Sequence, residues 1–392
     1  MRILVLAPEP FFEPRGALFS LYNHIKALLT IGYEIDLVTY PIGKQVNLPG
    51  LTVYRAPAIP LIREVKPGPS LAKIPLDFAL FLTAVWRLCL RRYRELHTHE
   101  EASLMGVLLA FIFRCKHLYC MHCDLAQLIA SSGFIKNPLI IRCLEAVQKF
   151  MVRKSDAVIA FYPEIESTAK RMAPGKPVYM ILPPAVDEDL PPARQEDVAR
   201  LREQLHLGDA PVLLYTGTLE AYQGLDILLR SVVIVRSKFP AARYVIVGGR
   251  AEQVDKLRLL AQELGVTDVV SIVGPRPLEE MPIYMALSHI LLSPRSKGDH
   301  TPLKLYTYLR SGKPILGTAI YAHTQILTPE IALLVPPTPQ DLAEGALELL
   351  QNPERAQALG DNARRVAEEQ YSWSAFLEKV RQVYGEFASL AR

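Results

Sequence analysis

Long apolar runs are missing from this sequence of 392 residues. The most apolar stretch, Phe78–Trp86, has nine residues between Asp77 and Arg87, whereas a membrane-spanning helix needs about 20. The start of the chain also lacks the pattern of a secretory signal, because Arg2 is followed at once by a short apolar run and then by prolines. We therefore expect neither a spanning helix nor a cleaved leader.

Disulfide and metal chemistry have little support in the cysteine pattern. The five cysteines lie in the first half of the chain and follow no regular frame, which is typical of a reducing compartment rather than a disulfide scaffold. Cys120 and Cys123 have Cys-x-x-Cys spacing, but no second Cys/His pair follows at a finger-like distance. We therefore expect a cytoplasmic protein without a metal.

A strong excess of one charge is also absent. The 44 Lys+Arg and 40 Asp+Glu residues leave a net charge of +4, which is too small to indicate nucleic acid as a partner. Residues 1–190 hold 22 basic and 17 acidic residues, a balance of +5, and residues 191–392 hold the remaining 22 and 23, a balance of −1. The basic first half favours an anionic surface or substrate, although an ordinary solvated face explains it equally well.

The segment Leu76–Leu90 is an apolar helix with a basic end. The basic residues are Arg87, Arg91, Arg92 and Arg94. Such a segment could lie at the headgroup boundary of a bilayer, at the inner face of the membrane. The alternative is a core helix whose cationic last turn suits the helix dipole.

Strands and helices alternate in two successive sets. The first set begins with the buried strand Arg2–Ala7, a helix over Phe19–Ile31 and the strand Glu34–Tyr40. The other expected strands are Leu51–Arg55, Leu118–Met121, Ala157–Ala160, Val178–Leu182, Val212–Tyr215, Arg243–Val247, Val269–Val273, His289–Ser293, Pro314–Thr318 and Ala332–Val335. We predict an α/β chain of two facing, doubly wound, Rossmann-like domains over 1–190 and 191–370. A helix over 371–392 is expected to cross back to the first domain.

The most specific motif runs from Ser293 to Pro314, SPRSKGDHTPLKLYTYLRSGKP. It resembles the donor-binding segment of retaining glycosyltransferases of the GT-B fold, family 4 (glycosyl transferases group 1), where a Pro-x-Lys-x-x-Glu-Tyr-x-x-x-Gly-Lys-Pro run is common. The glycines after Val247, the Leu-Val-Pro-Pro segment at Val335 and the run Tyr371-Ser-Trp add to the resemblance. The resemblance implies a nucleotide-sugar donor bound in the second domain.

Two glutamates separated by seven residues bind the donor in that family. Asp299 and Thr307 occupy these positions here. The resemblance implies that Asp299 accepts hydrogen bonds from sugar hydroxyls. Thr307 offers the ribose one hydroxyl where a carboxylate accepts two charge-assisted bonds, or it simply faces a helix neighbour.

An Arg and a Lys usually hold the donor diphosphate in the family, in the loop after the first strand of the second domain. In the loop that begins at Gly217, Thr218 and Gln223 occupy these positions. Each lost charge-assisted bond is worth roughly 1.5–3 kcal/mol, so donor affinity would fall by about two decades or more without compensation. The basic residues that could supply the missing charge are Arg295, Lys297, Lys304 and Arg250.

The first domain contributes a glycine loop and a histidine in this family. Gly16 would let the backbone approach the donor phosphate, and Arg15 could neutralise charge there; a plain turn is the alternative. His122 follows an expected strand, where the family places a histidine near the sugar. His97 and His99 would share one face of a strand, and His99 would line the cleft.

The resemblance implies transfer of a sugar from a nucleotide-sugar donor with retention of configuration, without metal or cofactor beyond the co-substrate. His122 and Asp299 are the candidate catalytic residues. The expected acceptor is lipid-linked or a cell-envelope glycan, with peripheral membrane contact and no nucleic acid. Because Thr218, Gln223 and Thr307 depart from the family pattern, a non-catalytic sugar- or nucleotide-binding protein is an alternative. A nucleotide-sugar epimerase ranks lower, since the sequence offers no positioned acid/base set.

Overall fold

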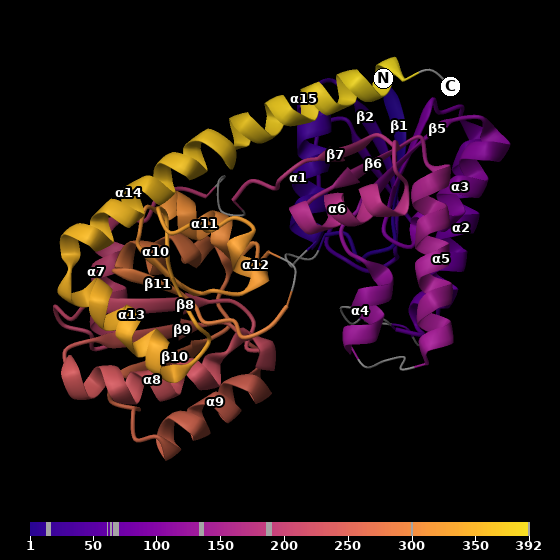
Figure 1. Ribbon diagram of the computed structural model, residues 1–392. Helices are drawn as coiled ribbons and strands as arrows, with labels where there is room; N and C mark the ends of the chain where they lie inside the picture. Colours follow the sequence, from indigo (N-terminus) through magenta and orange to yellow (C-terminus); the bar gives the residue numbers. More distant parts are fainter. Residues whose placement is uncertain are drawn as a thin grey trace. The chain divides into compact units, whose positions relative to one another are not determined.

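The computed structural model describes the chain except residues 13–16, 61, 63–64, 66–69, 133–136, 186–189, 299–300 and 391–392, and the side chains of residues 17, 131 and 132. The chain divides into two compact units (Figure 1). Unit 1 holds residues 1–183 and 376–392, and unit 2 holds residues 184–375. The last helix of the chain therefore belongs mostly to the unit that the first half forms.

Unit 1 is built on a seven-stranded parallel sheet in the order β3-β2-β1-β4-β5-β6-β7. The strands are β1 (Arg2–Ala7), β2 (Glu34–Thr39), β3 (Leu51–Arg55), β4 (Glu95–His99), β5 (Lys116–Met121), β6 (Ala157–Ala160) and β7 (Val178–Met180). The strand order reverses between β1 and β4. In open α/β sheets ligands bind beyond the carboxyl ends of the strands at such a reversal.

Helices cover both faces of this sheet. They are α1 (Ala17–Thr30), α2 (Lys73–Leu90), α3 (Ala102–Phe113), α4 (Leu125–Ser132), α5 (Pro138–Lys154), α6 (Pro163–Met172) and α15 (Trp373–Ser389). Leu6 and Leu96 pack with the buried sides of α2 and α3. On the opposite face, the Tyr384 hydroxyl of α15 lies 3.2 Å from Nδ1 of His97. Alternation along β4 thus separates an apolar layer from a histidine-rich one.

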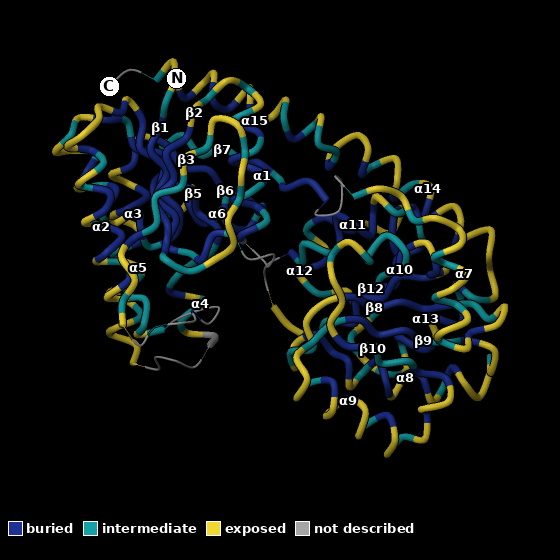
Figure 2. The backbone as a smooth tube through the Cα atoms, turned by 180° about the vertical axis from the view of Figure 1, so that it is seen from behind, coloured by how far each residue is buried: buried dark blue, intermediate teal, exposed yellow. Residues whose placement is uncertain are grey.

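Unit 2 repeats the design with a six-stranded parallel sheet in the order β10-β9-β8-β11-β12-β13. The strands are β8 (Val212–Thr216), β9 (Arg243–Val247), β10 (Val270–Gly274), β11 (Ile290–Ser293), β12 (Ile315–Thr318) and β13 (Leu333–Val335). The order reverses between β8 and β11. Short apolar runs form these strands because the sheet is covered on both faces. Figure 2 shows the central strands of both units as buried, whereas the edge strands β3, β7 and β13 are mostly of intermediate exposure.

The helices of unit 2 are α7 (Gln195–Gln204), α8 (Leu225–Lys238), α9 (Ala251–Glu263), α10 (Met281–Leu287), α11 (Lys304–Ser311), α12 (Tyr321–Thr324), α13 (Pro339–Gln351) and α14 (Pro353–Gln370). Two 3₁₀ turns, η1 (Ala221–Gln223) and η2 (Leu278–Glu280), lie in its loops. Leu229 of α8 and Leu342 of α13 belong to the core cluster of this unit.

The predicted fold class, two doubly wound parallel α/β sheets, is confirmed. Across the described residues, every helix is too short or too polar to traverse a bilayer.

Candidate functional site

The loops after β8 and β9 touch backbone to backbone at the carboxyl edge of the unit 2 sheet. Gly217 follows β8 with φ 137°, and Gly248 follows β9 with φ 120°. A Cβ atom on Gly248 would lie 1.9 Å from the Gly217 carbonyl oxygen. The Gly217 amide donates to the Val247 carbonyl at 3.0 Å. Glycine at both positions is what allows this contact.

The loop after β11 contacts the loop after β8. Gly224 has φ 71°, and a Cβ atom on it would lie 2.0 Å from the Pro294 carbonyl oxygen. The Ser296 amide donates to the Tyr222 carbonyl at 2.9 Å. Three strand-to-helix loops are therefore held together at the edge where the sequence predicts the donor diphosphate.

Lys304 is a buried cation beside these loops. It is the first residue of α11, and its Nζ lies 3.8 Å from the ring centroid of Tyr215 and 5.8 Å from that of Tyr308. Among the described residues this buried Nζ has no hydrogen-bond partner. Burial, and then the charge of Arg295, hold the pKa of Lys304 well below its usual range. A desolvated ammonium of this kind gains strongly from an anionic ligand.

Arg295 and Lys297 contribute differently. The Arg295 guanidinium lies 4.9 Å from the ring centroid of Tyr222, and its Nε donates to the Lys297 carbonyl at 2.8 Å. The Lys297 side chain is exposed. The loop therefore fixes the position of Arg295, and, besides burial, the charge of Arg295 lowers the pKa of Lys304. Lys297 contributes its backbone carbonyl, which accepts the hydrogen bond from Arg295. Arg250 forms an ion pair with Glu220 at 2.9 Å.

Thr218 and Gln223, which the sequence resemblance matches to the family's Arg and Lys, contact each other. Gln223 Nε2 donates to Thr218 Oγ1 at 3.3 Å. Gln223 is 8% exposed, and its buried Oε1 has no partner within the described part of the chain. The side chains at these two positions are thus polar but uncharged, whereas the basic residues Arg295 and Lys304 come after β11.

Thr307 is buried, three residues after Lys304 on α11. Asp299, Arg15 and Gly16 lie outside the described residues. Sequence reasoning missed Tyr215 and Tyr308, the two aromatic rings beside the Lys304 ammonium. Tyr215 lies near the carboxyl end of β8. This position at the end of a predicted strand could have indicated that Tyr215 lies near the site.

In unit 1, His122 follows β5 and contacts His99 at the end of β4. Nδ1 of His99 lies 2.9 Å from Nε2 of His122, and the two rings are stacked. The His122 ring also stacks on Phe161 with centroids 4.2 Å apart. Burial lowers the pKa of His122 to about 3 and that of His99 well below its usual range. Both rings are neutral near pH 7, so they can orient a sugar hydroxyl but not supply a proton.

His24, His99 and Cys120 have ligand atoms within 4.8 Å of one another, and this group comes closest to a metal site among the described residues. His24 Nε2 lies 2.9 Å from the Tyr384 hydroxyl, and burial raises the pKa of the Cys120 thiol. In the described structure these groups pack against one another and against Tyr384. His24, His99 and His122 are called the histidine cluster below.

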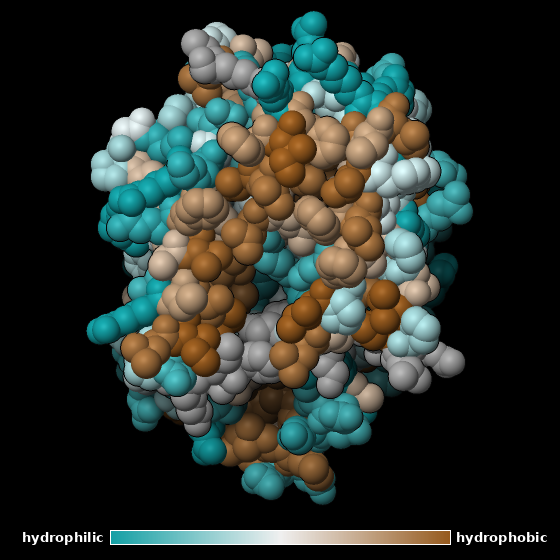
Figure 3. Space-filling model, turned by 90° about the vertical axis from the view of Figure 1, so that its right-hand side faces the viewer, coloured by the Kyte–Doolittle hydropathy of each residue, from teal (hydrophilic) through white to brown (hydrophobic). Residues whose placement is uncertain are grey.

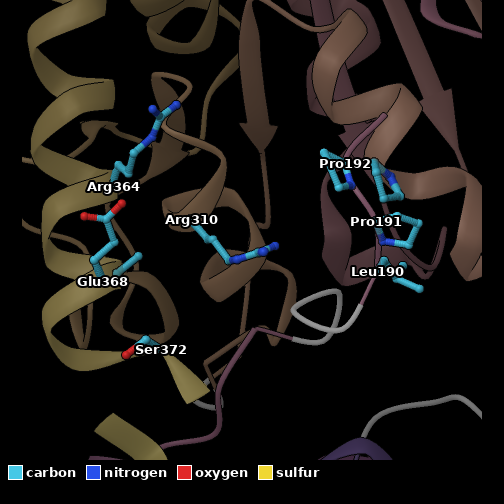
Figure 4. A pocket seen from close by; sticks show the side chains of 9 residues that line it. Leu190, Pro191, Pro192, Arg310, Arg364, Glu368 and Ser372 are labelled. Atoms are coloured by element: carbon cyan, nitrogen blue, oxygen red, sulfur yellow. The ribbon is translucent and has the colours of Figure 1, made fainter. Parts of the chain in front are cut away.

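A separate 520 Å³ pocket lies in unit 2. Figure 4 shows Pro191 and Pro192 on one side, Arg310 extending from α11, and Arg364 and Glu368 on α14. Arg364 donates to the Ser311 carbonyl at 3.0 Å. None of the predicted site residues lines this pocket.

Comparisons with known proteins find similar chains. Residues 197–366 match the model of the family described as glycosyl transferases group 1. The GDP-mannose-dependent alpha-(1-6)-phosphatidylinositol monomannoside mannosyltransferase of Mycolicibacterium smegmatis is 31% identical over 49% of this chain and 52% of its own length. The D-inositol 3-phosphate glycosyltransferase of Corynebacterium jeikeium is 24% identical over 88% of this chain and 84% of its own length.

The solved structures show the same fold. Sucrose-phosphate synthase from Thermosynechococcus elongatus superposes with a TM-score of 0.78 at 20% identity, covering 99% of this chain and 100% of that one. The chain spans about half the length of the first curated relatives that it matches. Residues 197–366 are thus similar to the glycosyl transferases group 1 family, and the chain has the GT-B fold.

Proposed function

We propose that this protein transfers a sugar from a nucleotide-sugar donor to an acceptor hydroxyl with retention of anomeric configuration. The observation that carries the proposal is the Lys304 ammonium, buried beside the loops after β8 and β11 with no hydrogen-bond partner in the described residues. A diphosphate is the group that such a cation and the neighbouring loop amides would stabilise. The donor's leaving group is a diphosphate.

The proposed chemistry uses electrostatic stabilisation of the departing diphosphate. As the bond from the anomeric carbon to the diphosphate breaks, negative charge accumulates on the phosphate oxygens, and Lys304 with Arg295 would balance it. The acceptor hydroxyl forms the new bond and passes its proton to the departing phosphate. His122 would orient the sugar as a neutral group, and Asp299 and Thr307 would bind donor hydroxyls. No metal or other cofactor enters this scheme.

The names of the relatives support a nucleotide-sugar donor, since one of them is a GDP-mannose-dependent mannosyltransferase. Gly217, Gly16 and Arg15 would approach the donor phosphates, and Thr218 and Gln223 would hydrogen-bond to them. The neutral Thr218–Gln223 pair is also the observation that favours the second candidate function, a protein that binds nucleotide sugars without turning them over.

Turnover decides between these candidates. We expect a panel of nucleotide sugars mixed with the protein to release nucleoside diphosphate from one of them, and the Lys304→Met variant to release far less. Tight binding of a nucleotide sugar without release of nucleotide would favour the non-catalytic protein. Formation of a C2 epimer would identify an epimerase.

We also propose peripheral contact with the inner face of a membrane through α2, with a lipid-linked or cell-envelope acceptor. Five exposed apolar side chains recur at every fourth residue of α2: Ile74, Phe78, Leu82, Trp86 and Leu90. These five residues are called the α2 stripe. Figure 3 shows apolar side chains gathered on the side of the molecule that carries α2, α3 and α5. The basic residues at the end of α2 suit anionic headgroups.

Sedimentation with liposomes tests the membrane contact. The protein should pellet with vesicles that contain anionic lipid, and a Phe78→Ser, Trp86→Ser variant should remain in the supernatant. Leu259→Ser, at a residue 60% exposed on α9 of unit 2, is the matched control and should pellet normally. Equal pelleting of all three proteins would contradict the contact.

A further inference from the structure

A 400 Å³ cavity lies at the carboxyl edge of the unit 1 sheet. Segments that follow β1, β4 and β5 form its polar side together with Lys73 and Asp77 of α2, and apolar side chains on and beside α2, α4 and α5 form its other walls. Its lining includes Glu9, Leu71, Lys73, Ile74, Asp77, Glu100, Glu101, Cys123, Leu125, Leu128, Ile129 and Leu144. The cavity lies wholly within unit 1, and it does not contain His122 or any other residue assigned above to the donor.

A buried carboxyl group and a partly buried one line the polar side of the cavity. Glu100 has a positive φ of 49° and is 8% exposed. Its Oε2 accepts a hydrogen bond from the Cys123 thiol at 3.3 Å, and burial raises the pKa of Glu100 to about 8. Asp77 accepts a hydrogen bond from the Tyr40 hydroxyl at 2.6 Å, and burial raises its pKa to about 7. A protonated carboxyl group both donates and accepts hydrogen bonds, as a sugar hydroxyl requires.

The cation in the lining is already paired. Lys73 Nζ lies 2.8 Å from Glu101 Oε1 and 3.8 Å from Glu9 Oε1. Among the described lining residues, this single cation faces four carboxyl groups. A phosphate entering the cavity would meet negative or neutral carboxyls rather than a free positive charge, and this costs binding energy.

The apolar wall is continuous with the α2 stripe. Ile74 lines the cavity and is also the first member of the stripe, with 64% of its side chain exposed. Leu71, one turn earlier, lines the cavity and is 71% exposed. An amphiphile whose tail lies along the stripe would therefore present its head to the carboxyl groups.

We infer that this cavity binds the uncharged, hydroxyl-bearing head of an amphiphilic acceptor and discriminates against a phosphate-bearing head. The inference rests on the proposed function, because it names the acceptor class of that reaction. The cavity combines carboxyl groups that can bind hydroxyls, a lysine that is already paired with Glu101, and leucine walls that lead to an exposed apolar helix face.

Two probes that share a tail test the inference. n-Octyl glucoside and n-octyl phosphate, both below their micellar concentrations, are titrated into the protein by calorimetry. We expect octyl glucoside to bind at least about tenfold more tightly than octyl phosphate, a difference of about 1.4 kcal/mol. Octyl phosphate binding as tightly as octyl glucoside would overturn the inference.

Three variants test where octyl glucoside binds and which residues disfavour octyl phosphate. Leu128→Trp fills the cavity and should weaken octyl glucoside about tenfold or more, whereas Leu104→Trp, on an exposed position of α3, should not change it. Glu101→Gln leaves Lys73 without its closest acid, so octyl phosphate should bind this variant about tenfold more tightly than it binds the unaltered protein. Equal effects of the two tryptophans, or no gain with Glu101→Gln, would count against the cavity.

A measurement on the unaltered protein covers the case in which a variant does not fold. Octyl glucoside should slow the alkylation of the half-buried Cys123 and leave that of the exposed Cys143 unchanged; equal rates with and without the probe would contradict the inference. Nucleotide release in the absence of acceptor reports the proposed function separately. If no nucleotide sugar is turned over while octyl glucoside protects Cys123, the transferase proposal fails and the cavity assignment remains.

Discussion

Replacing Lys304 by methionine should change stability and donor binding in opposite directions. Methionine keeps an unbranched stem beside the Tyr215 ring and removes the ammonium. In the folded protein that ammonium is buried 3.8 Å from the Tyr215 centroid, and no described residue hydrogen-bonds to it. Keeping a proton on this buried amine therefore costs folding free energy, and under the proposed function a bound diphosphate would offset that cost.

The sign of the stability effect follows from the pKa of Lys304. Burial lowers this pKa in the folded protein below its usual value, so the unfolded chain binds more protons between the two values. Stability of the unaltered protein should therefore rise with pH through that window and level off above the unfolded value of about 10.4. Lys304→Met removes this dependence, and at pH 7 it should melt at a higher temperature than the unaltered protein.

The binding effect has the opposite sign. A charge-assisted hydrogen bond to a diphosphate is worth roughly 1.5–3 kcal/mol, which corresponds to a loss of roughly 10- to 150-fold in affinity for the nucleoside diphosphate. Lys304 should also take up a proton when the nucleotide binds. Calorimetry in two buffers of different ionisation enthalpy would detect this proton uptake in the unaltered protein, and it should be missing in the Lys304→Met variant. A variant that melts at a lower temperature and binds the nucleotide as before would refute the assigned role of Lys304.

Three further outcomes follow from the structure. Arg295→Ala with Lys297→Ala should weaken donor binding and turnover, measured by calorimetry and nucleotide release; unchanged values would remove both from the donor site. Gly248→Ala should destabilise unit 2 by more than about 2 kcal/mol in urea unfolding, because its Cβ would overlap a backbone oxygen. Gly265→Ala, whose Cβ meets nothing within 4 Å, should cost only the roughly 1–2 kcal/mol of a left-handed residue. The melting temperature should fall as the pH drops from 6.5 toward 3, because the histidine cluster is held neutral in the folded state with pKa values near 3 for His24 and His122; a flat profile over that range would contradict this.

Most of the sheet could be predicted because its strands are short apolar runs between turns. Strand β4, Glu95–His99, was harder to recognise because its sequence is largely polar. It is buried nonetheless, since His97 lies 3.2 Å from Glu95 on the same strand and 3.2 Å from the Tyr384 hydroxyl of α15. That partner is 287 residues away in the chain, and no local pattern could have indicated it.

The sequence motif indicated where to look for a donor site, but not how its basic residues are buried and paired. The motif around Lys304 indicated a donor-binding segment and a shortage of charge in the loop after β8. Which basic residue we propose as the compensating charge depends on burial and pairing, which the sequence does not show. Lys304 rests on Tyr215 of β8, while Arg250 is engaged with Glu220. The cavity in unit 1 was not predicted, because its lining comes from segments between Glu9 and Leu144.

Proton NMR of the protein mixed with a panel of nucleotide sugars and an alkyl glucoside acceptor follows donor, product and anomeric configuration at once. We predict that one nucleotide sugar is consumed, that nucleoside diphosphate accumulates, and that the new glycosidic bond keeps the configuration of the donor. A nucleotide sugar that binds to the loops around Lys304 but is never consumed, or a product of inverted configuration, would contradict the proposed reaction.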